Sequence, residues 1–302
     1  MPTAPVLPPS ITSALPTART TKTPDRGPLP TGGVVVGVDD SASAVHTAVW
    51  GARHAVQQGV PLTIVHCAGI ASNHPLGELM GIAGRVTALL PDVHARFEVR
   101  TGDPVEVLTE MSRRAAMIVV GTAGGDAFEP DGSVPVRLVA RSQAPVAVVA
   151  GGGRVHGPVL VGVDGSPRSL AALEFAAHEA RRSEVGLIVL MAWVEVVLDE
   201  SSGGLQMVQN WTVESSRWER ELTRLLTGLR ARFPDLEVTG ELVHHRAAGA
   251  LVDRAADCSE VVIGRRGSGR IHSLAAGSTS RALLAAAAGV VVVLPDTAHL
   301  TG

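Results

Sequence analysis

The sequence predicts an α/β fold of two tandem doubly wound domains, each with a five-stranded parallel sheet flanked by helices. Three observations support this prediction. The segment Val34–Ser41, VVVGVDDS, recurs as Val159–Ser166, VLVGVDGS, so the chain contains an internal repeat. Short runs of valine and isoleucine are continuous rather than alternating, as is typical of strands buried on both faces. These runs alternate with helical segments, which favours a parallel sheet with right-handed crossovers.

The first half of each repeat is a strand, a helix and a second strand. The helix is predicted at Ala42–Gln57 in the first copy and at Pro167–Arg182 in the second, because apolar residues recur there at helical spacing. Apolar strands follow at Leu62–Cys67 and Leu187–Ala192. Both copies therefore begin with a β-α-β unit.

The second half of each repeat also matches. Met117–Thr122, MIVVGT, corresponds to Val261–Arg265, VVIGR. Each copy then ends with a Gly-Ser pair, a helix and a last strand, at Val146–Val149 in the first copy and Val290–Val293 in the second. The expected order in each copy is β-α-β-α-β-α-β-α-β. Neither first turn contains the G-x-G-x-x-G sequence of a dinucleotide site.

The repeat sets the expected domain boundaries at residues 31–152 and 155–297. The second copy is the longer one, and its extra length falls around Asp199–Asn210, before a polar helix near Thr212–Arg232. Residues 1–30 are rich in proline and threonine. Because prolines at this density cannot continue a helix or donate to a β-ladder, we expect a disordered arm.

Composition argues against several classes of protein. The formal net charge of −3 offers no basic stripe for nucleic acid. Cys67 and Cys258 are the only cysteines and cannot form a disulfide framework, which indicates a reducing, cytoplasmic compartment. No segment approaches the roughly 18 consecutive apolar residues that span a bilayer. We therefore expect no nucleic-acid partner and no membrane association.

A glycine-rich loop follows the fourth strand of the second copy. It consists of Gly264, Arg265, Arg266 and Gly267, then nine residues that include Arg270, then Gly277, Ser278, Thr279 and Ser280 at the start of a helix. The glycines permit backbone angles and close approach that a Cβ would block. The free amides and the dipole of the helix N-terminus attract an anion, and the arginines add positive charge. The hydroxyls can bind phosphate oxygens, or one of them a metal ion.

Each piece of this loop also has a purely structural interpretation, in which the glycines end a strand and Ser278 caps a helix. Their joint position after the fourth strand favours phosphate binding. Ligands of open parallel sheets lie beyond the carboxyl ends of the strands, at the point where the strand order reverses. If the first and fourth strands are neighbours, Asp164 faces the loop across this crevice.

Together, the pattern G-x2-G-x9-G-[S/T] and the VGVDGS of the first strand resemble the universal stress protein family. The resemblance covers about Gly33–Gly151 and Gly157–Pro295. It implies sheets of strand order 3-2-1-4-5, with ATP, and Mg²⁺ as an option, at the junction of strands one and four. It also implies pairing of the units through their last strands, which a tandem chain can satisfy internally with Val146–Val149 and Val290–Val293. The resemblance leaves open whether two chains also form a homodimer.

The resemblance also implies roles for individual residues. Asp164 would approach the ribose or adenine end of the nucleotide, and the end of the second strand, at Met191–Ala192, would help to form the adenine slot. The phosphates would be held, with help from Thr279 or Ser280, by Gly264, Gly267, Gly277 and Ser278.

The first copy departs from this pattern. Its corresponding residues are Asp39, Gly121, Gly124, Gly132 and Ser133. Only seven residues separate its second and third loop glycines, and this shorter loop carries three acidic residues where the second copy carries arginines. Reversing three partly screened charges weakens a polyphosphate complex by roughly 10- to 100-fold. We therefore predict that the second domain binds ATP and that the first binds it weakly or not at all.

The leading interpretation is a cytoplasmic, stress-associated, ATP-binding protein that acts as a nucleotide-dependent switch or scaffold. One alternative is a slow ATPase or phosphoryl-transfer enzyme, in which Asp164 and a loop hydroxyl would serve a metal. Another is an interaction module whose nucleotide sites are vestigial. The sequence positions no acid or base and shows no Ser-His-Asp, Cys-His or metal-ligand spacing, so we assign no catalytic residues and no metal ligands.

Overall fold

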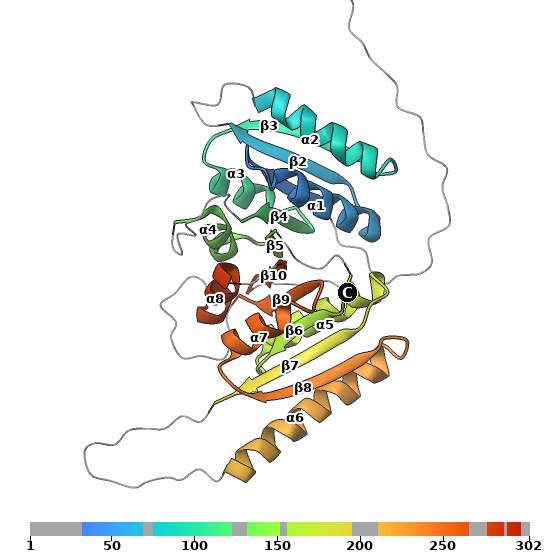
Figure 1. The fold of residues 1–302 in the computed structure, drawn as a ribbon, viewed down its shortest axis with the longest axis vertical. Helices are drawn as coiled ribbons and strands as arrows, with labels where there is room; N and C mark the ends of the chain where they lie inside the picture. Colours follow the sequence, from blue (N-terminus) through green and yellow to red (C-terminus); the bar gives the residue numbers. More distant parts are fainter. Residues whose placement is uncertain are drawn as a thin grey trace, which may run out of the picture.

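The computed structural model describes residues 32–68, 75–122, 132–151, 156–194, 211–265, 277–286 and 289–296. Within these stretches, strands and helices alternate along the chain (Figure 1). The elements of the first domain are β1 (Val34–Val38), α1 (Ala44–Gln58), β2 (Leu62–Ala68), α2 (Pro75–Leu89), β3 (Ala95–Thr101), α3 (Pro104–Met111), β4 (Met117–Gly121), α4 (Val134–Arg141) and β5 (Val146–Val149). Those of the second are β6 (Val159–Val163), α5 (Pro167–Arg182), β7 (Leu187–Trp193), α6 (Trp211–Arg232), β8 (Val238–His244), α7 (Ala247–Ala255), β9 (Glu260–Gly264), α8 (Ser278–Ala286) and β10 (Val290–Leu294).

The strands of both domains join in one ten-stranded sheet of order β3-β2-β1-β4-β5-β10-β9-β6-β7-β8. Each half is parallel and has the predicted order 3-2-1-4-5, so the predicted fold is confirmed. The halves meet where β5 and β10 pair antiparallel, with Val146 opposite Val293 and Val149 opposite Val290. The internal pairing of the two last strands is therefore also confirmed.

Helices cover both faces of this sheet, as a doubly wound fold requires (Figure 1). Helices α1, α2, α5 and α6 pack on one face, and α3, α4, α7 and α8 pack on the other. A hydrophobic core lies on each face of the sheet. The valines of β1 are continuous because the strand contributes to both cores, with Val34 and Val36 in one and Val35 in the other. No helix in the described ranges combines the length and the apolar character that crossing a membrane requires.

Glycines within the first strand of each domain allow a helix of the second face to approach closely. A Cβ on Gly37 would lie 2.7 Å from a terminal methyl carbon of Leu108 on α3. A Cβ on Gly162 would lie 2.9 Å from the corresponding methyl carbon of Leu251 on α7. The same close contact between the first strand and a helix of the second face therefore occurs in both repeats.

Helix α1 starts later than predicted. The periodicity suggested a start at Ala42, whereas the helix begins at Ala44. The hydroxyl of Ser41 donates to the carboxylate of Asp39 at 2.5 Å and therefore does not cap the helix. The first turn of the first domain is thus closed by a bond between side chains, and its helix begins two residues further along the chain.

Polar and charged side chains are buried between α1 of the first domain and α5 of the second. Nε2 of Gln58 donates to Oε1 of Glu179 at 2.7 Å, and Nδ1 of His54 lies 3.5 Å from Oε2 of the same carboxylate. Arg182 donates to this carboxylate from Nη1 at 3.3 Å. Glu260, at the start of β9, is also buried. The interface between the domains therefore combines a continuous sheet with a group of buried ionisable side chains.

Candidate functional site

The strand order of the second domain reverses between β6 and β9. Strand β6 pairs with β7 on one side and with β9 on the other, both parallel. Asp164 follows β6 and Arg265 follows β9, so the two residues leave the sheet at the carboxyl ends of neighbouring strands. The adjacency on which the predicted crevice depends is therefore present.

Asp164 lies in a tight turn at the N-terminus of α5. Its Oδ1 accepts the amide of Ser166 at 3.0 Å, and its own amide donates to the hydroxyl of Ser169 at 3.2 Å. The turn passes through Gly165, whose φ of 77° is unfavourable for residues with a Cβ. Ser166 also caps α5 by accepting the amide of Ser169 at 3.2 Å. These bonds hold the half-buried carboxylate beside the first turn of the helix.

The glycine-rich loop begins and ends at the same place in the structure. The amide of Gly277 donates to the carbonyl oxygen of Arg265 at 3.0 Å. The hydroxyl of Ser280, which is buried, donates to the same oxygen at 3.1 Å. The first turn of α8 is therefore held against the end of β9. Gly267, with Arg266 and Arg270, lies outside the described residues.

Gly264 ends β9 where the chain passes close to α5. A Cβ at this position would lie 3.3 Å from the Cβ of Arg168 and 3.4 Å from its carbonyl oxygen. Absence of a side chain at residue 264 therefore lets the start of the loop pass against the first turn of α5. This packing places the start of the loop beside the helix turn that directly follows the Asp164 turn.

The three hydroxyl residues at the start of α8 differ in exposure. Ser278 is exposed, Thr279 is half-buried and Ser280 is buried. The Ser280 hydroxyl is already bound to the end of β9, as described above. The amides of a helix's first turn have no partner within the helix, and they lie at the positive end of its dipole. Ser278 and Thr279 are therefore the hydroxyl residues best placed to meet an anion.

The side chain of Arg265 makes different contacts from those suggested by its place in a phosphate loop. Its Nη2 lies 3.2 Å from Oδ2 of Asp296, and its Nη1 donates to the carbonyl oxygens of Val139 and Ala140 in the first domain at 3.3 and 2.9 Å. The Arg265 side chain is 11% exposed. Its charge is thus paired within the protein, which a sequence pattern alone does not reveal.

A model of the universal stress protein family matches residues 32–150 and 156–295. The chain belongs to the universal stress protein family. The matches follow the two halves of the ten-stranded sheet, so each half is one family unit.

Tandem relatives have the same organisation along nearly their whole length. Universal stress protein Rv2005c of Mycobacterium tuberculosis is 33% identical over 288 residues, which cover 86% of this chain and 96% of that protein. Universal stress protein Rv2623 of the same organism is 31% identical over 292 residues, covering 88% and 97%. The crystal structure of a universal stress protein from Archaeoglobus fulgidus DSM 4304 matches with a TM-score of 0.61 at 18% identity, covering 88% of this chain and 97% of that one. This likeness concerns the fold.

The predicted adenine slot lies at the end of β7, beside β6. Met191 is buried and Ala192 is half-buried in the described structure. The next residue, Trp193, is buried and packs at a tilt against the ring of His244, with 4.6 Å between the ring centroids. The aromatic ring therefore packs within the protein next to the predicted slot.

The first domain of this universal stress protein differs at the corresponding positions. Its Asp39 is exposed and binds Ser41, and a Cβ on Gly121 would lie 2.9 Å from the hydroxyl of Thr47. The side-chain oxygen of Ser133, before α4, is buried and has no hydrogen bond. Gly124 lies outside the described residues, and Gly132 precedes α4.

A further difference between the two crevices was not recognised from the sequence. His66 occupies the position on β2 that Met191 occupies on β7. The His66 ring is buried, neither ring nitrogen has a hydrogen bond, and Nε2 lies 3.7 Å from Oδ1 of Asp40. A comparison of the two repeats residue by residue would have identified this replacement of a thioether by an imidazole.

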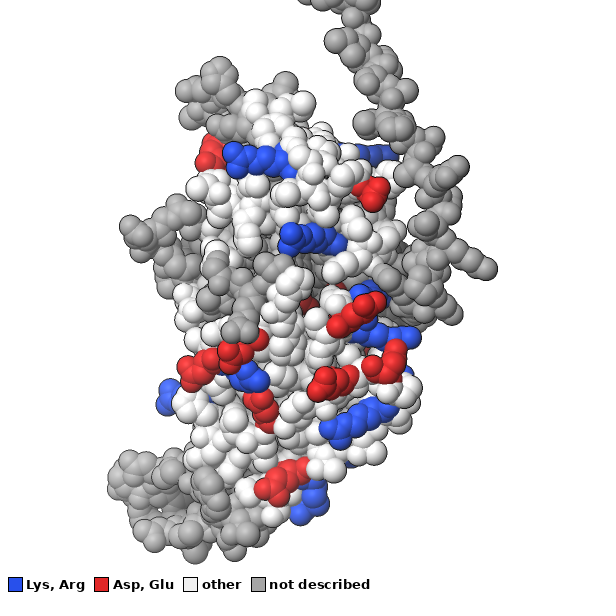
Figure 2. Space-filling model, turned by 45° about the vertical axis from the view of Figure 1, so that its right-hand side comes forward, with Lys and Arg blue, Asp and Glu red and all other residues white. Residues whose placement is uncertain are grey.

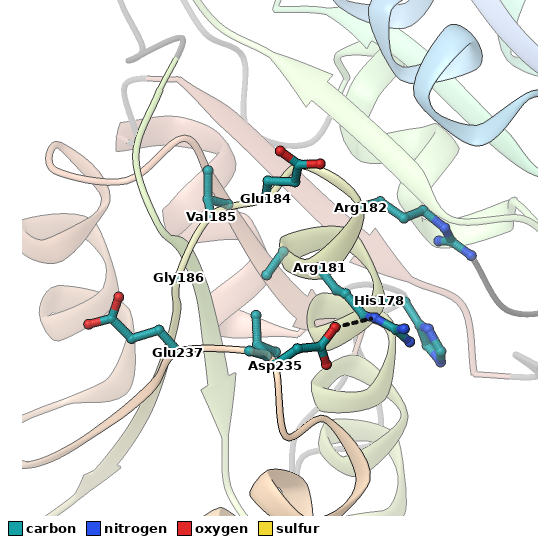
Figure 3. A pocket seen from close by; sticks show the side chains of 10 residues that line it. His178, Arg181, Arg182, Glu184, Val185, Gly186, Asp235 and Glu237 are labelled. Atoms are coloured by element: carbon teal, nitrogen blue, oxygen red, sulfur yellow. Dashed lines mark hydrogen bonds and ion pairs between the residues drawn. The ribbon is translucent and has the colours of Figure 1, made fainter. Parts of the chain in front are cut away.

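A hollow of about 450 Å³ lies at the other end of the second domain, where the chain enters β7 and β8 (Figure 3). Its rim carries charges of both signs, and Arg181 pairs there with Asp235 at 3.1 Å. Charged side chains of both signs are also interspersed over the face of the molecule shown in Figure 2. This hollow is separate from the crevice between β6 and β9, because the amino and carboxyl ends of parallel strands lie at opposite edges of the sheet.

Proposed function

We propose that the second domain binds ATP where β6 and β9 end, and that the protein acts as a nucleotide-dependent switch or scaffold in the cytoplasmic stress response. The observation that carries the proposal is the pair of hydrogen bonds from Gly277 and Ser280 to the carbonyl oxygen of Arg265. These bonds hold the N-terminus of α8 at the reversal point of the sheet. Phosphate oxygens are favoured there because they accept from first-turn amides and interact with the helix dipole.

Each predicted residue has a defined part in this proposal. The phosphates approach the backbone at Gly264, Gly267 and Gly277, where no side chain intervenes, and accept from the amides and hydroxyls of Ser278 and Thr279. Ser280 and the backbone of Arg265 hold the loop in position. Asp164 and Ala192, at the ends of the neighbouring strands β6 and β7, contact the ribose and the adenine. Mg²⁺, where it is bound, accompanies the phosphates.

A switch requires that the nucleotide prefer one conformation or assembly over another. The loop between Arg265 and Gly277 is the segment that a polyphosphate would contact most directly. In the first domain, the corresponding loop is shorter and acidic in sequence. We therefore propose one ATP site for each chain.

Isothermal titration calorimetry with ATP tests the proposal through matched variants of the two repeats. Asp164→Ala removes a carboxylate that accepts the amide two residues ahead, and Asp39→Ala removes the same kind of contact in the first domain. We expect one site in the wild type, at least about a 10-fold loss of affinity in Asp164→Ala, and unchanged affinity in Asp39→Ala. Two equal sites, or equal losses in both variants, would contradict the proposal.

Two further measurements distinguish the alternatives. Release of phosphate from labelled ATP above buffer background, abolished in Asp164→Ala, would favour a slow ATPase over a switch. Protein purified under native conditions without a bound adenylate, and without a thermal shift on adding ATP, would favour an interaction module. For the switch, we expect a bound adenylate and turnover at background level.

A further inference from the structure

Arg265 stands at a junction of the second domain's proposed nucleotide site. Its amide donates to the carbonyl oxygen of Leu294 at 2.9 Å, which fixes the residue to the end of β10. Its carbonyl oxygen accepts from Gly277 and Ser280, as described above. The backbone of one residue therefore connects the last strand, the end of β9 and the first turn of α8.

The side chain of Arg265 extends this junction into the first domain. It reaches the carbonyl oxygens of Val139 and Ala140, in the last turn of α4. The last carbonyls of a helix lack partners within the helix and form the negative end of its dipole. A largely buried guanidinium with two helix carbonyls and the Asp296 carboxylate around it is held in one orientation, because its planar fork fits several acceptors at once.

Helix α4 leads from this contact to the crevice of the first domain. It starts directly after Ser133, which corresponds in the repeat to Ser278. Its eight residues span about 12 Å at 1.5 Å each. The helix also contacts α8 across the domain boundary. One short rigid element therefore separates the loop of the second domain from the corresponding position of the first.

Asp296 connects the same guanidinium to the Asp164 turn. Its Oδ1 lies 3.0 Å from Nε of Arg168, in the first turn of α5, while its Oδ2 pairs with Arg265. A displacement of Arg265 therefore alters contacts on both sides of the proposed ATP site.

Among the described residues, the first domain shows no equivalent of this contact. The residue after β4 that corresponds to Arg265 is Thr122, whose amide makes the equivalent bond to Val149 at 3.1 Å. Threonine has no cation and is too short to reach across to α8. The two domains are related by sequence, but at these two corresponding positions only Arg265 of the second makes the connection.

We propose that Arg265 is a positioning residue that couples nucleotide binding in the second domain to helix α4, and through α4 to the crevice of the first domain. This inference rests on the proposed ATP site. Coupling between two sites is reciprocal. If ATP bound to the second domain changes the affinity of the first crevice for a ligand, that ligand changes the affinity of the second domain for ATP by the same factor.

Hydrogen–deuterium exchange of the whole chain, with and without ATP, tests this coupling. In the wild type we expect ATP to slow amide exchange in residues 138–143 by at least about threefold. In Arg265→Ala this change disappears. The matched control is Arg254→Ala, which breaks ion pairs with Glu241 and Asp257 inside the second domain and leaves α4 untouched; it retains the wild-type response.

Arg265→Lys is a milder substitution that tests the same coupling if the alanine variant fails to fold. Lysine keeps a cation beside Asp296, but a single ammonium lacks the fork that serves two carbonyls and a carboxylate together. We expect this variant to fold, to bind ATP and to lose at least half of the response of α4. A full response in either Arg265 variant, or none in the wild type despite ATP binding, overturns the coupling alone. Wild-type protein that binds no ATP overturns the proposed function as well.

Discussion

Gln58 and Glu179 lie 121 residues apart in the sequence and share a buried hydrogen bond of 2.7 Å between Nε2 and Oε1. The bond joins α1 of the first domain to α5 of the second. The same carboxylate receives Arg182 and faces His54, and it lowers the cost of burying their polar groups. The domain interface is thus sensitive to protonation as well as to packing.

The first prediction concerns Glu260. Burial, and secondarily the Glu179 carboxylate, raise the pKa of Glu260 to about 8. The folded protein retains this proton at pH values where the unfolded chain has lost it. Stability from this group is therefore complete below about pH 4.5 and is lost as the pH rises toward 8, by on the order of 4 kcal/mol.

Glu260→Gln keeps the shape of the side chain and removes its titration. Urea denaturation at pH 5 and pH 8 should show that the variant gains stability over the wild type as the pH rises. The half-buried Glu221, which pairs with the exposed Arg224, offers a control, since Glu221→Gln should change stability by less than about 1 kcal/mol at both pH values. If the stability of Glu260→Gln and of the wild type changed in parallel with pH, the raised pKa of Glu260 would be contradicted.

The second prediction concerns His54 and has the opposite sign. Burial lowers the pKa of His54, the nearby Glu179 opposes this shift, and Arg182 adds to it. The unfolded chain takes up a proton near pH 6.5, which the folded protein binds less readily. Stability from the neutral ring is therefore present above pH 6.5 and is lost as the pH falls below it.

In His54→Gln, the loss of stability between pH 7 and pH 5 should be smaller than in the wild type. Denaturation midpoints at the two pH values measure this loss. His46 on the exposed side of α1 provides the matched control, with His46→Gln following the wild type. If both variants show the same slope between these pH values, the buried ring does not contribute as stated.

The third prediction compares two helix glycines. A Cβ on Gly51 of α1 would lie 2.4 Å from a methyl carbon of Val36, which is fully buried and β-branched. Gly228 on α6 is exposed and has nothing within 4 Å of the same position. Both alanine variants gain helix propensity, but only Gly51→Ala overpacks a core.

We expect Gly228→Ala to stabilise the protein by about 0.5–1 kcal/mol and Gly51→Ala to destabilise it by about 1–3 kcal/mol. Thermal unfolding followed by circular dichroism distinguishes them. A stabilising effect of Gly51→Ala would show that α1 can move away from β1 at little cost.

The fourth prediction compares helix caps at related positions. Ser166 accepts the amide of Ser169 at the start of α5, whereas Ser43, in the N-cap position of α1, makes no such bond. Ser166→Ala should cost about 1 kcal/mol in urea denaturation, and Ser43→Ala less than about 0.5 kcal/mol. Equal costs would mean that the capping bond does not account for the difference between the turns.

Much of the fold follows from patterns that are local in the chain. Continuous runs such as Val34–Val38 predict buried strands, and the spacing of apolar residues predicts α5 at Pro167–Arg182. The start of α1 was predicted too early, because the bond between Ser41 and Asp39 is a matter of side-chain geometry. The repeat and the glycine-rich motif were enough to suggest the family and the reversal point between β6 and β9.

By itself, the sequence determined the duplicated order of strands and helices and located the candidate nucleotide loop. It could do so because apolar runs and turn glycines are patterns of residues that lie close together in the chain. Only the tertiary structure decided that Arg265 reaches α4 of the first domain and that Glu179 is shared across the interface. Those contacts depend on how β5 and β10 pair, which brings together side chains more than 100 residues apart. An arginine in a glycine-rich loop has the same local pattern whether its partner is a phosphate or a helix carbonyl, so its use is settled by what the fold places within reach.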